Sequence, residues 1–285
     1  MRTSNIVMVV IGLAGVAGAI LLAIRGAKLP VVPERPPDGD GRRKDSVGGA
    51  VADGIRRVTC ILAAGWVAGF LVVGLGGRLV MRIIGATSGD GAQGRLTDAE
   101  AVVGEITLGG TVGFVIFAGL VVPIATAFLY LPVRRFLPNR AWQSGLLYSV
   151  LLLAVFGISD PLERDSIDFV ILSPNWLSVV LVITAAALFG LTLASMVALC
   201  ERSVPTIGDR GVRWTAWIPY LSLIGLINPI GVPIVVVYLV GRAVSRGRLD
   251  SAWARPGVRL TSLGVGAAAC LVSLVVVGGV AVDLV

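Results

Sequence analysis

Two arginines four residues apart are the side chains whose type and spacing are most typical of a binding site in this sequence. Arg78 and Arg82 lie in the stretch GGRLVMRIIG, and a helix places residues at this spacing on one face. At a helical rise of about 1.5 Å per residue, Arg78 lies about 31 Å beyond Arg57 along one helix, near the outer boundary of a membrane. A pair of arginines at that position calls for a partner.

Three interpretations of this arginine pair stay open. The guanidinium groups can reach lipid phosphates at the membrane surface. They can form an ion-pair network with Glu105 and Asp160, which we predict at the outer ends of neighbouring helices, because guanidinium and carboxylate groups form paired hydrogen bonds. They can also belong to an anion-binding or gating site, since ionisable residues in membrane segments are often functional.

The residues of most familiar catalytic sites are missing. The sequence has no histidine, which excludes Ser-His and Cys-His nucleophiles and histidine-ligated metals. Cys60, Cys200 and Cys270 stand singly without C-x-x-C spacing, so they indicate neither a metal site nor a redox pair. GLGGRL lacks the third glycine of a dinucleotide-binding loop. We therefore predict no catalytic residue, no cofactor and no metal, and a protein that is not an enzyme.

The composition is that of a chain that crosses a membrane several times. Hydrophobic residues make up 56% of the 285 residues and charged residues 14%, and a helix needs about 20 apolar residues to cross about 30 Å of hydrocarbon. The sequence predicts an all-α polytopic transmembrane helix bundle with about seven hydrophobic segments. These segments are 5–24, 58–79, 107–131, 143–159, 177–200, 216–240 and 260–282.

The positions of the apolar segments divide the chain into four parts. The stretch KLPVVPERPPDGDGRRKDSVGGA is rich in Pro, Gly and charges, so it cannot bury a core. We predict an N-terminal membrane anchor (1–25), a flexible cytoplasmic linker (26–57), a four-helix transmembrane unit (58–200) and a C-terminal transmembrane pair (201–285).

The distribution of basic residues predicts the orientation. Lys and Arg collect on the cytoplasmic side of membranes, and the largest basic group lies between Arg25 and Arg57. This predicts a bacterial cytoplasmic (inner) membrane protein with its N-terminus outside. The excess of 24 basic over 17 acidic residues is typical of contact with membrane lipids. The arginines are dispersed among loops, so we predict no nucleic-acid binding.

The stretch LIGLINPIGVPIVVV, residues 223–237, carries a candidate helix break at Asn228, Pro229 and Pro233. A crossing at 216–240 would place the basic loop that follows outside, against the positive-inside tendency. A re-entrant segment would keep that loop inside, and such segments usually line a conduit. We favour a kinked span, because proline bends transmembrane helices and early helices usually set the topology.

Small residues four apart predict close helix packing. Gly65 with Gly69 and Gly109 with Gly113 have this spacing, which lets helix backbones approach in lipid. Two such pairs in adjacent segments predict contact between the second and third segments. Ala186 with Gly190 and Gly264 with Ala268 are further instances.

Four sequence motifs show a family resemblance: GGRLVMR, GEITLGGTVGF, LYLPVRRFLP and SDPLERDSIDFVILSPNWLSVVL. Together they cover about residues 65–200, and they resemble multi-pass membrane proteins of high-GC (actinobacterial-type) bacteria for which no activity is known. The resemblance implies a polytopic fold and no chemistry.

Three functions remain as hypotheses. The first is a non-enzymatic scaffold or regulatory membrane module that binds a membrane protein partner or a second copy of itself. The second is a small-molecule or ion permease, with Arg78, Arg82, Glu105, Asp160 and Asn228 beside the path. The third is a protein that holds lipid head groups with the outer arginines.

Overall fold

The computed structural model is all-helical, as the sequence predicts. It describes residues 3–31, 47–95, 102, 108–157, 174–207, 213–227, 231–245 and 256–284. The elements that position the candidate site are α1 (Thr3–Gly26), α3 (Val47–Ala68), η1 (Gly69–Gly76), α4 (Gly77–Thr87), α5 (Leu108–Ile116), η3 (Phe117–Val121), α6 (Val122–Val133), η4 (Arg134–Phe136), α7 (Ala141–Leu152), η5 (Leu153–Gly157), α9 (Asn175–Ser203), η6 (Trp214–Ile227), α10 (Gly231–Ser245) and α12 (Pro256–Leu284). A short 3-10 turn, η2 (Asp90–Ala92), follows α4.

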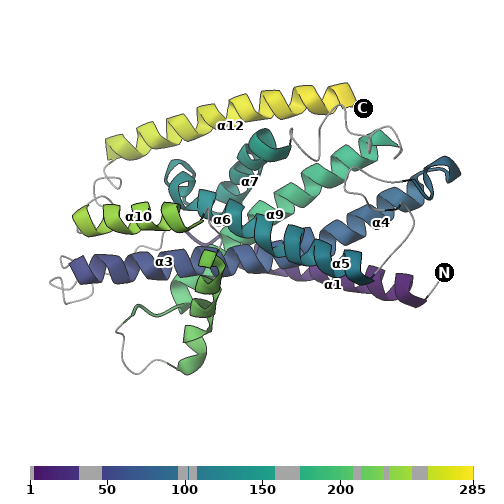
Figure 1. Ribbon diagram of the computed structural model, residues 1–285. Coiled ribbons are helices and arrows are strands. Elements are labelled where there is room, and N and C mark those ends of the chain that lie inside the picture. Colours follow the sequence, from purple (N-terminus) through teal and green to yellow (C-terminus); the bar gives the residue numbers. More distant parts are fainter. Residues whose placement is uncertain are drawn as a thin grey trace.

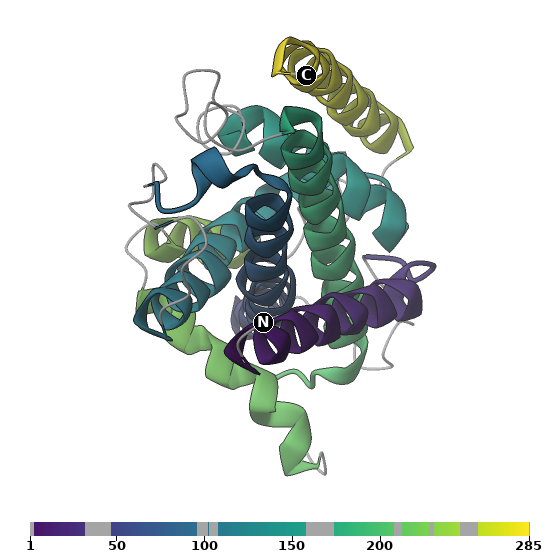
Figure 2. The ribbon, with the colours of Figure 1, turned by 90° about the vertical axis from the view of Figure 1, so that its right-hand side faces the viewer.

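Five described helices are long and apolar enough to cross a membrane. They are Ile6–Gly26, Val47–Thr87, Gly109–Phe136, Asn175–Ser203 and Gly257–Val282. Two further apolar helices, Ala141–Phe156 and Val232–Gly241, are shorter. The long helices pack in one bundle, in which α9 is inclined to α3 and α12 (Figure 1), and Figure 2 shows the bundle turned by 90°. The fold therefore belongs to the class of all-helical membrane proteins.

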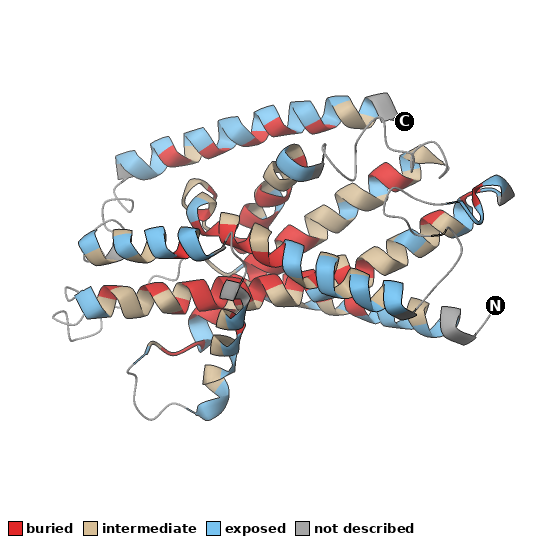
Figure 3. Cartoon of the chain, viewed as in Figure 1, coloured by how far each residue is buried: buried red, intermediate tan, exposed pale blue. Residues whose placement is uncertain are grey.

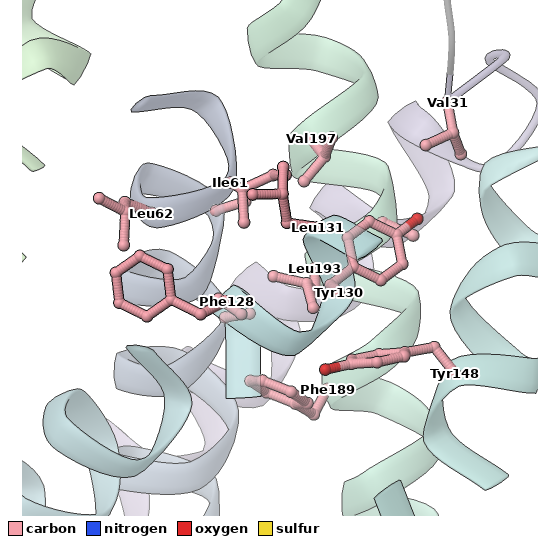
Figure 4. Close-up of a cluster of buried hydrophobic side chains, with 14 of the residues drawn as sticks. Val31, Ile61, Leu62, Phe128, Tyr130, Leu131, Tyr148, Phe189, Leu193 and Val197 are labelled. Carbon is pink, nitrogen blue, oxygen red and sulfur yellow. The ribbon is translucent and has the colours of Figure 1, made fainter. Parts of the chain in front are cut away.

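The buried core lies where α3, α6, α7 and α9 meet (Figure 3). Helix α9 packs against α7, α3 and α1, so it holds the bundle together from the inside. Large side chains fill the space between these helices (Figure 4), and Phe128, Tyr130, Tyr148 and Leu193 are each at most 1% exposed. Helix α12 covers the bundle from outside and keeps most of its surface exposed (Figure 3).

The second and third long helices do pack through glycines, but only one predicted pair takes part. A Cβ atom built on Gly65 would lie 2.6 Å from Cβ of Ala127, and one on Gly69 would strike Gly119 and Pro123. These glycines therefore allow α3 and η1 to approach α6 and η3.

The other predicted glycine pair has no such neighbour. A Cβ atom on Gly109 or on Gly113 would meet nothing within 4 Å among the described residues. The third long helix does lie against the preceding one, and the close backbone approach falls further along the chain than this pair, at Gly119.

The predicted linker at 26–57 is ordered at both of its ends. Residues before Val31 lie against the start of α7: Val31 N–H donates to Asn139 O at 2.7 Å, and Ala141 N–H donates to Leu29 O at 3.0 Å. Helix α3 begins at Val47 rather than at 58, because Asp53 pairs with arginines one turn further on and so stabilises a helix in this polar stretch. Residues 32–46 of the predicted linker lie outside the described residues.

Neighbouring helices alternate in direction through the first part of the chain. Helix α1 runs antiparallel to α4 and η1, since Gly12 lies beside Leu79 and Gly18 beside Leu71. Helix α7 runs antiparallel to α9, since Gly145 meets Gly190 and Leu153, which follows α7, packs in one cluster with Val179 near the start of α9. The end of α9 therefore lies at the same end of the bundle as the start of α7.

Helix α12 runs parallel to α7. The thiol of Cys270 points to Leu147 O at 3.7 Å, and further along both helices Val277 packs in one cluster with Leu153. The start of α12 therefore lies at the same end of the bundle as the start of α7 and the end of α9. We call this the basic end, because it gathers Arg25, Arg56, Arg57, Arg134, Arg135, Arg202 and Arg259.

The connection between α9 and α12 leaves the basic end and returns to it. Residues 216–240 do not form the single kinked helix that we favoured: they divide between η6, a 3-10 helix, and α10, and α10 is too short to be counted among the five long helices. Asn228 and Pro229 lie outside the described residues. Pro233 occupies the first turn of α10, where its missing N–H leaves no helical hydrogen bond unmade.

Candidate functional site

A buried ion pair between η4 and α9 is the strongest polar feature of the structure. Arg134 Nη1 lies 2.7 Å from Glu201 Oε1, and the two residues are only 6% and 5% exposed. Charges so far from water are tolerated when they are paired and hydrogen-bonded. The pair therefore fixes the end of α6 and η4 against the end of α9.

A second arginine ties α3 to the same point. Arg56 Nη1 donates to the backbone carbonyl of Glu201 at 2.7 Å, and Arg56 Nη2 donates to Asp53 Oδ1 at 3.0 Å. Arg57 Nε donates to the other oxygen of Asp53 at 3.0 Å. Three helices that are far apart in the sequence thus meet through one group of charges, which we call the ion cluster: Asp53, Arg56, Arg57, Arg134 and Glu201.

The ion cluster carries more positive than negative charge. Three arginines face two carboxylates, so its formal charge is +1. Arg56 is 3% exposed, and its Nε is buried without a hydrogen-bond partner. Guanidinium groups remain protonated in proteins, so the cluster offers fixed charge rather than a proton donor, and it suits holding helices or an anion better than acid–base catalysis.

The surroundings of the ion cluster are apolar and tightly filled. Cys60, Cys200 and Val204 form a buried cluster between α3 and α9. One helical turn before Arg134, the Tyr130 hydroxyl lies 2.8 Å from the Ser144 hydroxyl. All three cysteines are free and buried, so the site shows no exposed thiol.

The arginine pair singled out in the sequence lies in α4, away from the basic end. The Arg78 guanidinium carbon lies 4.9 Å from the centre of the Phe114 ring, and Arg78 Nη1 points to the Met81 sulfur at 3.8 Å. Arg82 follows one turn later and is half-buried. Glu105 and Asp160, the predicted acidic partners, lie outside the described residues.

Arg78 therefore has an aromatic neighbour, and the predicted ion-pair network remains a prediction. A guanidinium over an aromatic ring is attracted by the ring's electrons, so Phe114 supplies one contact between α4 and α5 that the sequence analysis did not foresee.

The ion cluster was not predicted from the sequence either. One signal was present: Glu201 is an acidic residue directly after the apolar segment 177–200, and Arg134 lies three residues after the end of the segment 107–131. Their contact joins positions that lie 67 residues apart, and no local pattern reveals such a pairing.

A shallow hollow lies beside the basic end. Its volume is about 410 Å³, and its walls come from the end of α9 and the start of η6. The lining residues are Ser203, Val204, Arg213, Thr215, Ala216 and Pro219. Within the described parts of the chain, no group of three or more His, Cys, Asp or Glu residues could hold a metal ion.

Comparisons with protein-family models, with curated proteins and with solved structures find no match to this chain. The class of the protein therefore comes from its fold, and its function must be argued from the ion cluster.

Proposed function

We propose that this protein is a non-enzymatic membrane module that scaffolds or regulates a partner complex. The observation that carries the proposal is the use of the buried charges: Arg134, Glu201 and Arg56 hold three helix ends together. Charges used in this way stabilise one arrangement of helices and are not available to bind a passing substrate.

Close contacts between helices support the same proposal. A Cβ atom on Gly145 would lie 2.5 Å from Gly190 O and 2.9 Å from Cα of Leu191, so α7 and α9 touch through their backbones. Such contacts replace the hydrophobic driving force that helices lack in lipid. They favour a rigid platform over a bundle that opens around a solute.

We further propose a topology in a bacterial cytoplasmic membrane. Of the seven apolar segments, six cross, namely α1, α3 to α4, α5 to α6, α7 to η5, α9 and α12, and the segment at 216–240 does not. Lys and Arg favour the cytoplasmic side, so the basic end faces the cytoplasm and the N-terminus lies outside. This topology also places the arginines between α10 and α12 inside.

A second candidate function is a small-molecule or ion permease, and one observation favours it. The chain between α9 and α12 returns to the end that it left, and it divides into η6 and α10. Interrupted segments of this kind border the paths of many transporters. In that case the Arg134–Glu201 pair is a closed inner gate.

One variant separates the two functions. Glu201→Gln removes the acidic partner of Arg134, and Arg202→Gln, which removes the exposed charge next to it, is the matched control. The proteins are reconstituted in liposomes, and efflux of protons, potassium, chloride and small polar solutes is recorded. A platform gives no flux with either variant, whereas a gate gives flux that rises in Glu201→Gln only, and this second result would overturn the proposal.

A direct test of the platform uses native membranes. The full chain is extracted in native nanodiscs, and the particle mass and composition are measured. The proposal expects this 29.5 kDa chain in a fixed ratio with a second polypeptide or with further copies of itself, and it expects Glu201→Gln to loosen the assembly. A lone chain with unchanged mass in every preparation contradicts it.

A further inference from the structure

Helix η6 has an exposed apolar face that no described element covers. Its residues project outward every third position: Ile218, Leu221 and Ile224 are 51%, 66% and 57% exposed. A 3-10 helix has three residues per turn, so residues three apart line up along one edge. The exposed residues therefore form one straight stripe, which Thr215 continues toward the start of the helix.

The opposite face of η6 holds it against the bundle. Ser222 is 8% exposed, and its hydroxyl donates to Thr59 O of α3 at 3.1 Å. The Tyr220 hydroxyl donates to Pro205 O at 2.8 Å. These contacts fix which face of η6 points outward, so the exposure of the stripe is a property of the fold.

Helix η6 lies across the bundle, whereas the membrane-length helices run along it. In Figure 1 the unlabelled green helix below α3 runs across the direction of α3, and in Figure 2 it extends away from the other helices at the lower edge. With 14 residues and a rise of about 2 Å per residue, η6 is about 28 Å long.

The level of η6 along the bundle is that of the ion cluster. Ser222 contacts Thr59, three residues from Arg56, and Tyr220 packs against the cluster of Cys60, Cys200 and Val204, which adjoins Glu201. The helix begins at Trp214, which is 76% exposed, and Arg213 directly before it is also exposed. Tryptophan and arginine gather where lipid head groups meet acyl chains.

We propose that η6 is an anchor lying in the plane of the membrane, whose Ile218, Leu221 and Ile224 stripe inserts at the head-group boundary of an anionic leaflet. A helix at this boundary is held by burial of its exposed apolar side chains and by neighbouring basic residues that meet anionic lipids. Arg213 and Arg202 supply the basic charge at the start of η6 and at the end of α9. The occupant of the stripe is thus a phospholipid surface containing phosphatidylglycerol or a similar anionic lipid.

This inference requires that the long helices cross a membrane, but it does not depend on the scaffold role. A failure of the scaffold proposal in the flux test leaves it intact. Its own failure would leave the ion cluster and the contacts between α7 and α9 unchanged.

The test measures the depth of one residue of the stripe. Leu221→Cys is labelled with an environment-sensitive fluorophore in the otherwise unchanged chain, since Cys60, Cys200 and Cys270 are buried. Quenching is compared for aqueous iodide, for lipids brominated near the head group and for lipids brominated near the chain end. Two control labels calibrate the scale: Gly48→Cys at the exposed start of α3, and Val272→Cys on α12, which is 65% exposed.

The expected result is strongest quenching of the Leu221 label by lipids brominated near the head group. We expect the Val272 label to respond to the deeper bromines and the Gly48 label to iodide. Replacing phosphatidylglycerol by phosphatidylcholine should lower the quenching of the Leu221 label by a factor of two or more. Arg213→Gln should remove this dependence on lipid charge.

Two results would overturn the proposal. Iodide quenching of the Leu221 label equal to that of the Gly48 label means that the stripe faces water. Protection from iodide and from all brominated lipids means that a protein covers it, either a second copy or a partner. Ile218→Cys, on the same stripe, repeats the measurement where Leu221→Cys does not fold.

Discussion

Arg134 and Glu201 are the pair of residues on which the basic end depends most. Removing one partner of a buried ion pair leaves the other charge buried alone, which costs about 3–5 kcal/mol. We therefore expect Arg134→Met and Glu201→Met each to lower the midpoint of thermal unfolding strongly. The double variant should lose less than the sum of the two, since neither charge then remains buried.

The buried cysteines supply the readout for this double-mutant cycle. Cys60, Cys200 and Cys270 are free and buried, so a thiol-reactive dye reports unfolding as each becomes accessible. Arg202→Gln, an exposed change next to Glu201, should shift stability by less than about 0.5 kcal/mol. Strictly additive losses would mean that Arg134 and Glu201 do not act as a pair.

At the scale of elements, α7 and α9 approach closely because Gly145 and Gly190 face each other at their crossing and neither has a side chain. We expect Gly145→Ala to destabilise the bundle by about 1–3 kcal/mol, because the added carbon would lie 2.5 Å from Gly190 O, a backbone atom that cannot rotate away. The same change at Gly113, which has no described residue within 4 Å of the added carbon, should be neutral or slightly favourable, since alanine is the better helix former. The unfolding midpoint of the two variants in one detergent decides between these outcomes, and equal midpoints would contradict the close contact of α7 and α9 at Gly145.

Helices were easier to predict from this sequence than their partners. Long apolar runs identify α1, α9 and α12 because their length alone matches the membrane. The start of α3 was missed, since the polar residues around Asp53 resemble a linker until their ion pairs are seen. Gly65 and Gly69 were found by their spacing, but the same spacing at Gly109 and Gly113 serves no contact among the described residues.

The ion cluster shows why the candidate site could not be predicted locally. Arg56, Arg134 and Glu201 each stand near the edge of an apolar segment, where a charge ordinarily faces water or lipid head groups. Only the packing of α3, η4 and α9 buries them together. A short-range pattern such as the Arg78 and Arg82 spacing is visible in a sequence, but a meeting of three helix ends depends on the whole arrangement.

At the scale of the whole molecule, the directions of α7, α9 and α12 predict on which side of the membrane the connection between α9 and α12 lies. A labelling experiment can test this prediction. If the chain between α9 and α12 returns to the basic end, a residue in that connection must lie on the same side of the membrane as the start of α3. Single cysteines at Ser251, Gly48 and Thr87 test this, with Cys60, Cys200 and Cys270 replaced by alanine. Gly48 lies at the start of α3 and Thr87 at the opposite end of the same continuous helix.

An impermeant maleimide applied to intact cells should give the same result at Ser251 as at Gly48, and the opposite result at Thr87. With the proposed orientation, Thr87→Cys is labelled from outside, and the other two react only after permeabilisation. Because the comparison uses two ends of one helix as references, it does not depend on which end is cytoplasmic. If the Ser251 cysteine reacts together with the Thr87 cysteine, the connection crosses the membrane, α12 runs the other way, and the contacts of Cys270 and Val277 with α7 and η5 cannot be right.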